Sequence, residues 1–215
     1  MLTYAQGCPT LIGITSYPKV GDLPCVEYKE MVFQYLDEHP EITTVILFSR
    51  WTVWVEGTQY KQEAGTKFTL EDDWNELPEN ASSDLLFSTG LERTIQALID
   101  TGHNVVLVTT IPEIGYDVPS ANFIAFRTDR DLNQIIAPST GEYLARSQRT
   151  NDILNTLANK YDLDLIEPWK ILCNGGRCRV TLNNIPLYKD TNHLSFLGSE
   201  FISPAFDEYF LGSVK

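Results

Sequence analysis

The sequence lacks the long apolar run that a membrane-spanning helix requires. No window of the 215 residues approaches the roughly 18 uninterrupted apolar residues that would cross a bilayer. We therefore expect this chain by itself to be soluble. Its start, MLTYAQGCP, has neither the basic residues nor the apolar stretch of a signal peptide. For an exported protein, this leaves two alternatives: the domain was cut from a longer one, or the assignment to an oxidising compartment that the cysteines suggest is wrong.

Basic residues are few. The 16 lysines and arginines are scattered among 29 aspartates and glutamates, and the formal net charge is −13. Nucleic-acid binding needs clustered Lys and Arg that neutralise phosphates, so we expect no nucleic-acid partner. There is also no internal repeat and no glycine-rich phosphate loop, because CNGGRC lacks the flanking strand and helix of such a loop. We expect no nucleotide cofactor.

Cysteine is also scarce, and the four cysteines form two pairs that are close in sequence, Cys8 with Cys25 and Cys173 with Cys178. The second pair brackets glycines that allow the chain to double back. A zinc site is the rival interpretation, but neither pair has Cys-x-x-Cys spacing, and we expect His39 and His103 to be surface residues after helices. The spacing favours two disulfides over zinc or free thiols, and hence an oxidising compartment.

Apolar periodicity predicts alternating helices and buried strands. We expect helices at 25–37, 83–101 and 140–162 and a final one from Ser195, and strands at 43–51, 104–112 and 163–169. The segment 52–80 is predicted to hold only a small hairpin at the sheet edge, and 113–139 a loop. This order predicts one α/β domain whose parallel sheet is covered by helices on both faces.

The stretch PLYKDTNHLSFLG places Asp190 three positions before His193. An imidazole can take a proton from a hydroxyl near neutral pH, and a carboxylate that holds its other nitrogen improves it as a base. A bare Asp-x-x-His is common, however. The alternative is a helix-capping aspartate beside a solvent-facing histidine.

A resemblance favours the catalytic interpretation. LYKDTNHLSFLGSEFI resembles the last sequence block of SGNH-type esterases and acyltransferases, and more narrowly of the SGNH domain fused after the membrane domain of acyltransferase family 3 proteins. Those proteins modify bacterial surface polysaccharides. The resemblance extends over most of the chain, through TYAQGCPTLIGI, VILFSRWTVWVEG, LVTTIPEIGYDVP and LIEPWKILCNGGRCRV in that order.

The resemblance implies a three-layer α/β/α sandwich with a mostly parallel sheet, and residues 1–215 as a single SGNH-like domain. It also implies that Asp190 orients His193 and that His193 acts as general base toward a serine in a Gly-Asp-Ser motif. The sequence contains no such motif, and no serine replaces it. Ser16 has no aspartate before it, Ser49 and Ser88 have no better claim, and Ser195 is expected to be the N-terminal cap of the final helix. We therefore expect a domain truncated at its N-terminus, without its first strand and nucleophile.

Arg50 and Trp51 end the strand predicted at 43–51 and are candidate substrate-binding residues. By resemblance, Arg50 is a candidate oxyanion donor or acyl-site cation, and Trp51 a pocket wall or sugar platform. The alternative is that Trp51 is a core aromatic and that Arg50 pairs with an acid. The other tryptophans are expected to pack, with Trp54 the nearest of them to a ligand.

The resemblance predicts an O-acyltransferase domain that transfers an acyl group, expected to be acetyl, to a hydroxyl of a bacterial surface polysaccharide. A secreted carbohydrate esterase and an inactive remnant without the nucleophile are the alternatives. The implied partners are a fused or adjacent acyltransferase family 3 membrane domain and the polysaccharide acceptor. The implied location is the periplasm, tethered to the inner membrane, and we expect no metal or other cofactor.

Overall fold

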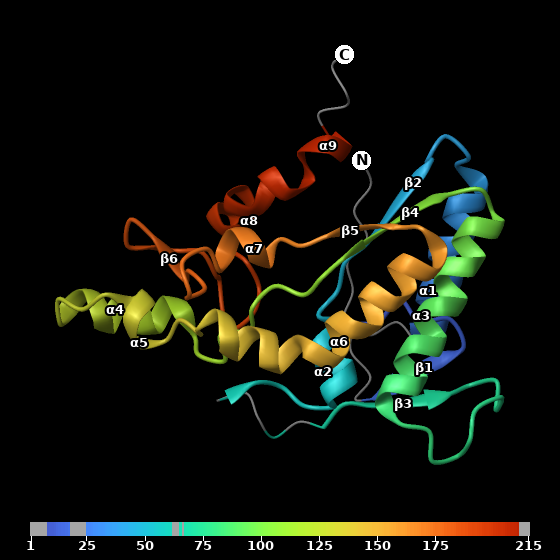
Figure 1. Cartoon of the computed structure of the whole chain (residues 1–215), viewed down its shortest axis with the longest axis horizontal. Helices are drawn as coiled ribbons and strands as arrows, with labels where there is room; N and C mark the ends of the chain where they lie inside the picture. Colours follow the sequence, from blue (N-terminus) through green and yellow to red (C-terminus); the bar gives the residue numbers. More distant parts are fainter. Residues whose placement is uncertain (1–7, 18–24, 62–64, 66, 211–215) are drawn as a thin grey trace. The chain divides into compact units, whose positions relative to one another are not determined.

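The structure is a computed structural model that describes residues 8–17, 25–61, 65 and 67–210 (Figure 1). Its described residues divide into two compact units. Unit 1 comprises those within 1–58, 67–108 and 149–165, and unit 2 those within 59–66, 109–148 and 166–215. Each unit is described separately.

Helices and short strands alternate along much of the chain. The strands are β1 (Ile14–Tyr17), β2 (Thr44–Leu47), β3 (Thr69–Asp72), β4 (Asn104–Val108), β5 (Asp164–Ile166), β6 (Thr181–Leu182) and β7 (Ile185–Pro186). The helices are α1 (Cys25–Glu38), α2 (Trp51–Glu56), α3 (Ser83–Asp100), α4 (Val118–Arg127), α5 (Leu132–Ile135), α6 (Thr140–Tyr161), α7 (Trp169–Leu172), α8 (Phe196–Ile202) and α9 (Asp207–Phe210), with the 3₁₀ helix η2 at Ser203–Phe206.

The main sheet is parallel and has the order β2-β4-β5, which confirms the predicted α/β class (Figure 1). The central strand β4 is buried from Val105 to Val108, as its apolar sequence predicts. The prediction that β2 is buried on both faces is wrong. Thr44 is exposed and only Leu47 is buried, because β2 lies at the edge of this sheet.

Within the segment 52–80, Thr58 and Lys67 form an isolated antiparallel bridge, but the segment adds no hairpin to the edge of the main sheet. Residues 51–56 form α2, and β3 pairs antiparallel with β1 in a separate two-stranded sheet, with Asp72 opposite Ile14. The aromatic and β-branched residues of α2 favour a strand by propensity, yet residues 51–55 are all buried. Burial on every side overrides that preference, and Gly57, with φ of 67°, ends the helix.

The predicted loop at 113–139 contains α4 and α5. Both helices begin after an aspartate whose side chain caps the first turn: Asp117 accepts from the Ser120 amide and Asp131 from the Asn133 amide. Pro119 also lies in the first turn of α4, where its missing N–H costs nothing. These start signals are visible in the sequence, although the helices are short.

Both predicted cysteine pairs are disulfide-bonded, and among the residues that the structure describes no cysteine is free. Cys8–Cys25 joins the segment before β1 to the start of α1 within unit 1. Cys173–Cys178 closes the turn after α7 within unit 2. The zinc and free-thiol alternatives therefore fall away.

Candidate active site

The segment between β7 and α8 is anchored by the start of α8. The Ser195 hydroxyl accepts from the Gly198 amide at 3.1 Å, which makes Ser195 the predicted N-cap of α8. The Ser195 amide donates to the Leu187 carbonyl at 2.9 Å, and its hydroxyl donates to the Pro186 carbonyl at 2.8 Å. The C-terminal side of the Asp190–His193 turn is thus held to β7 and the residue after it.

Asp190 and His193 are brought together within unit 2. Nδ1 of His193 lies 2.8 Å from Oδ2 of Asp190. The other carboxylate oxygen, Oδ1, accepts from the backbone amides of Asn192 at 2.9 Å and His193 at 2.7 Å. These backbone bonds form a local turn around the aspartate, so the carboxylate is already oriented when it meets the ring.

The electrostatics of this turn keep Asp190 ionised. Partial burial raises the pKa of Asp190, but the amides of Asn192 and His193 and the His193 ring together outweigh it, so the pKa lies below its usual value. With Nδ1 held by a carboxylate, Nε2 is the ring nitrogen that can take a proton from a substrate or nucleophile. The His193 side chain is 64% exposed, so solution species can reach it.

Three features near the turn were not identified in the sequence. The carbonyl of Thr191, inside the turn, accepts two backbone bonds from residues that follow Pro112. Glu113, in the same PEIG segment, is buried against Arg146. Phe196, the first residue of α8, is 85% exposed only three positions after His193. Phe196 could have been identified from the sequence, because it is an apolar residue directly after His-Leu-Ser. The bonds to the Thr191 carbonyl and the burial of Glu113 depend on contacts between residues distant in sequence.

Arg50 and Trp51 belong to unit 1. Trp51 is fully buried, donates from Nε1 to the Val108 carbonyl at 2.9 Å and meets the Phe87 ring edge-on at 5.8 Å. It is therefore a core aromatic of unit 1. Arg50 is half-buried and directly precedes α2. The substrate-binding roles of both residues stay predictions.

The serines that the sequence offered have other surroundings. Ser16 lies in β1, is 1% exposed, and its hydroxyl is 4.0 Å from Sγ of Cys25. The Ser88 hydroxyl donates to the Leu85 carbonyl within α3. Ser195 serves as the helix cap described above. These positions are typical of structural serines and give none of the three a claim as nucleophile.

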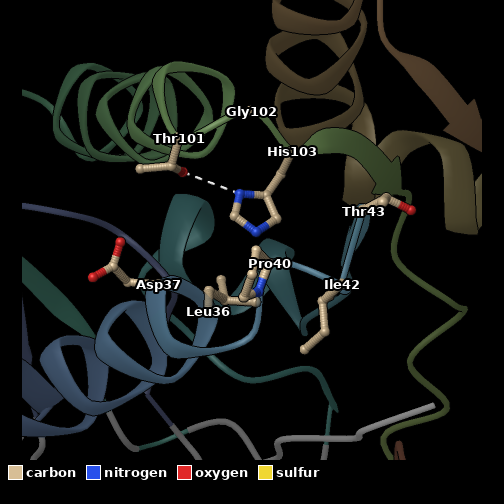
Figure 2. Close-up of a pocket in the computed structure, with 8 residues that line it drawn as sticks. All are labelled: Leu36, Asp37, Pro40, Ile42, Thr43, Thr101, Gly102 and His103. Carbon is tan, nitrogen blue, oxygen red and sulfur yellow. Dashed lines mark hydrogen bonds between the residues drawn. The ribbon is translucent and has the colours of Figure 1, made fainter.

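A cavity of about 130 Å³ lies in unit 1, at the amino ends of β2 and β4 (Figure 2). Its wall includes Asp37, Pro40 and His103, and the His103 ring faces Pro40 while Nδ1 bonds to the Thr101 hydroxyl at 3.0 Å. His103 is only 9% exposed, so the prediction of a surface histidine is wrong. Because open α/β sheets gather their chemistry at the carboxyl ends of strands, this cavity is not our candidate active site.

Within the described residues, no group of three or more His, Cys, Asp or Glu side chains could hold a metal ion. No helix in the part of the chain that the structure describes is long and apolar enough to cross a membrane. The candidate site contains an imidazole, its carboxylate and the backbone amides that hold the carboxylate. What that arrangement can do chemically is accept and return a proton at Nε2.

An α/β fold with a carboxylate-held histidine just before its last helices has the parts of the base and orienting acid of a serine-hydrolase triad. The chain matches the family described as "SGNH domain (fused to AT3 domains)" over residues 1–208. The chain belongs to this family of SGNH domains. The resemblance of its sequence blocks is thereby confirmed.

A solved structure has a similar fold. It is the periplasmic domain of a lipopolysaccharide acetyltransferase from Salmonella ser. Paratyphi A, with a TM-score of 0.62 and 14% identity, covering 95% of this chain and 69% of that one. At this identity the likeness shows the fold alone. A search of the curated proteins found no match.

Proposed function

We propose that this chain is the periplasmic SGNH domain of an O-acyltransferase that places an acyl group, acetyl in our proposal, on a hydroxyl of a bacterial surface polysaccharide. Membership of a family described as fused to AT3 domains supports an acyl-transfer role and an AT3 membrane domain as partner. The two disulfides support an oxidising compartment. The similar fold of a lipopolysaccharide acetyltransferase domain supports the choice of a glycan acceptor.

The observation that carries the proposal is the 2.8 Å contact between Nδ1 of His193 and Oδ2 of Asp190. In the proposed reaction, Nε2 takes the proton of a serine hydroxyl as its oxygen attacks the acyl carbonyl, and the leaving group then receives that proton. In the second half, Nε2 takes the proton of the sugar hydroxyl as its oxygen attacks the acyl-serine carbonyl, and it returns that proton to the serine oxygen as the acyl–serine bond breaks. Asp190 stabilises the imidazolium in both halves.

The nucleophile is the one part that this sequence does not supply, because it contains no Gly-Asp-Ser motif. We place the serine in a Gly-Asp-Ser block outside these 215 residues. This predicts that the chain alone turns over little ester and that a protein joining both parts is active. The motif's absence also supports a second candidate, an inactive remnant that kept the base and lost the serine.

The test uses a protein that carries this chain together with its AT3 domain and a Gly-Asp-Ser block. Transfer of labelled acetyl to polysaccharide is measured for His193→Ala and for His39→Ala. His39 is a matched control, because its Nδ1 also lies 2.8 Å from a carboxylate oxygen, that of Glu41, at the surface of unit 1. We expect His193→Ala to lower kcat by about 10² to 10⁴-fold, as for a lost general base, and His39→Ala to leave it unchanged.

Equal activities of the two variants would refute the role of His193. The identity of the product that carries the acetyl group distinguishes transfer from hydrolysis. Free acetate that is independent of added polysaccharide would favour the esterase alternative, since water would then be the acceptor.

A further inference from the structure

The backbone of the Asp190–His193 turn is held by a segment far away in sequence. Within unit 2, the amides of Ile114 and Gly115 both donate to the Thr191 carbonyl, at 3.0 and 3.1 Å. Thr191 lies between the catalytic pair, one residue after Asp190. A displacement of residues 114 and 115 would therefore move the peptide between Thr191 and Asn192, whose N–H donates to Oδ1 of Asp190.

Glu113 directly precedes these two donors and is tied to α6. Its side chain is 4% exposed, and Oε2 accepts from Nε of Arg146 at 2.9 Å. The Arg146 guanidinium also lies over the Tyr60 ring, 5.5 Å from its centre. Separating the two charges of a buried ion pair is costly, because each charge would then be buried without compensation. The pair therefore holds Glu113 in place against α6.

A second bond ties the same segment to the same helix. The Tyr143 hydroxyl, one turn before Arg146 on α6, donates to the Thr110 carbonyl at 2.8 Å. Tyr143 and Arg146 of α6 thus both contact the segment of residues 109–115, which follows β4 and donates to the Thr191 carbonyl. Helix α6 fixes both the position and the direction of this segment.

Gly115 shows how closely the segment is packed. Its φ is +70°, and a Cβ there would lie 2.7 Å from both the Tyr60 carbonyl oxygen and Cβ of Lys61. The Tyr60 carbonyl and the Lys61 side chain therefore lie against Gly115 so closely that only a residue without a Cβ fits there. The amides of Ile114 and Gly115 have little freedom to move once Glu113 is held.

From these contacts we infer that Glu113 and Arg146 are a positioning pair for the proposed catalytic turn. The pair holds the 113–115 segment, whose amides hold the Thr191 carbonyl and thereby set the carboxylate of Asp190 against His193. Neither residue touches the reacting atoms. The inference rests on the proposed function for the role of His193, but its geometry is tested without any turnover.

The experiment follows the three histidine rings and the backbone amides of the whole 215-residue chain by NMR. The variants are Glu113→Gln, which removes the charge and keeps the shape, and Tyr143→Phe, which removes the second tie. The matched control is Arg93→Gln in unit 1, which breaks a similarly buried pair in which Nη1 lies 3.0 Å from Oδ1 of Asp72. Circular dichroism of each variant confirms that it is folded.

We expect Glu113→Gln to shift the ring nitrogen signals of His193 and to speed the hydrogen exchange of the Gly115 and His193 amides by about tenfold, equivalent to one lost hydrogen bond. The rings of His39 and His103, in unit 1, should keep their signals. Tyr143→Phe should act in the same direction and more weakly. Arg93→Gln should leave the His193 ring unchanged.

Unchanged His193 ring signals and exchange in both Glu113→Gln and Tyr143→Phe would overturn the inference, since the pair would then be only structural. The same shifts in Arg93→Gln would also overturn it, because the effect would be one of global stability. In the active full-length protein, Glu113→Gln should lower kcat with little change in KM. If the NMR shifts occur and no wild-type transfer is found, the proposed function fails and the positioning role stands.

Discussion

Gly198 allows α8 to pack on the backbone that precedes the proposed catalytic turn. A Cβ at this position would lie 1.9 Å from the Leu187 carbonyl oxygen and 2.9 Å from its carbon. Ordinary Cβ contacts begin at 3.4 Å, so Gly198→Ala requires a displacement of about 1.5 Å. Leu187 is fully buried, and its carbonyl accepts from the Ser195 amide. The Leu187 carbonyl cannot move by about 1.5 Å and keep its hydrogen bond from the Ser195 amide.

The expected cost of Gly198→Ala follows from three contributions. Alanine gains about 1 kcal/mol over glycine in a helix. Overpacking costs typically about 1 to 3 kcal/mol, and the high end applies because the clash is with backbone. Losing the bond from Ser195 to Leu187 costs about 1 kcal/mol more. We therefore expect the free energy of unfolding to fall by about 3 kcal/mol.

Urea unfolding followed by circular dichroism measures this change. The matched control is Gly141→Ala in α6, where a Cβ would meet only Oγ of Ser139, at 3.9 Å. That variant should be unchanged or more stable by up to about 1 kcal/mol. If Gly198→Ala has the same urea midpoint as Gly141→Ala, the close approach to Leu187 does not constrain the helix and the reasoning is wrong.

Three further predictions concern the ends and crosslinks of the elements. Replacing Cys8 and Cys25 by serine opens a loop of sequence separation 17 and should lower the free energy of unfolding by about 3 kcal/mol, which denaturation in urea checks; a loss under 1 kcal/mol would contradict the loop-entropy account. Because the folded-state pKa of Asp190 is lowered, its stabilisation is present above the usual pKa near 3.8 and is lost as pH falls through the lowered value. Asp190→Asn should therefore flatten the acid limb of stability against pH, and an unchanged limb would contradict this. Ser82 caps α3, because its hydroxyl accepts from the Leu85 amide, so Ser82→Ala should lower the free energy of unfolding by about 1 kcal/mol. Thermal melting measures this loss, with Ser83→Ala as the control because Ser83 is the first helical residue and not the cap.

Local signals in the sequence were sufficient for the long elements and for the turn itself. The three-residue spacing of Asp190 and His193 is short enough that a single backbone turn sets their contact, so no distant segment had to be known. The helix beginning after Ser195 and the two disulfides were predictable for the same reason. Each depends on residues at most 17 positions apart.

Features that depend on distant partners were not predictable. The residues of α2 have strand propensity, and only their complete burial makes them helical. β2 has the composition of a fully buried strand, but its place at the edge of the sheet is a property of topology. His103 follows a helix, as surface histidines do, yet its backbone amide bonds to the Leu98 carbonyl and turns the chain inward after Gly102.

The proposed catalytic turn combines these two kinds of information. The contact of Asp190 with His193 is local, but the Thr191 carbonyl inside the turn is held from residues 114 and 115, more than 70 positions earlier. A sequence can therefore carry an intact Asp-x-x-His and still lose a positioned base if Glu113 changes. Conversely, the contacts described around the turn all lie within unit 2, so the geometry of base and orienting acid does not depend on where the nucleophile is supplied. This is why the ring signals of His193 can test the pair before any acyl transfer is observed.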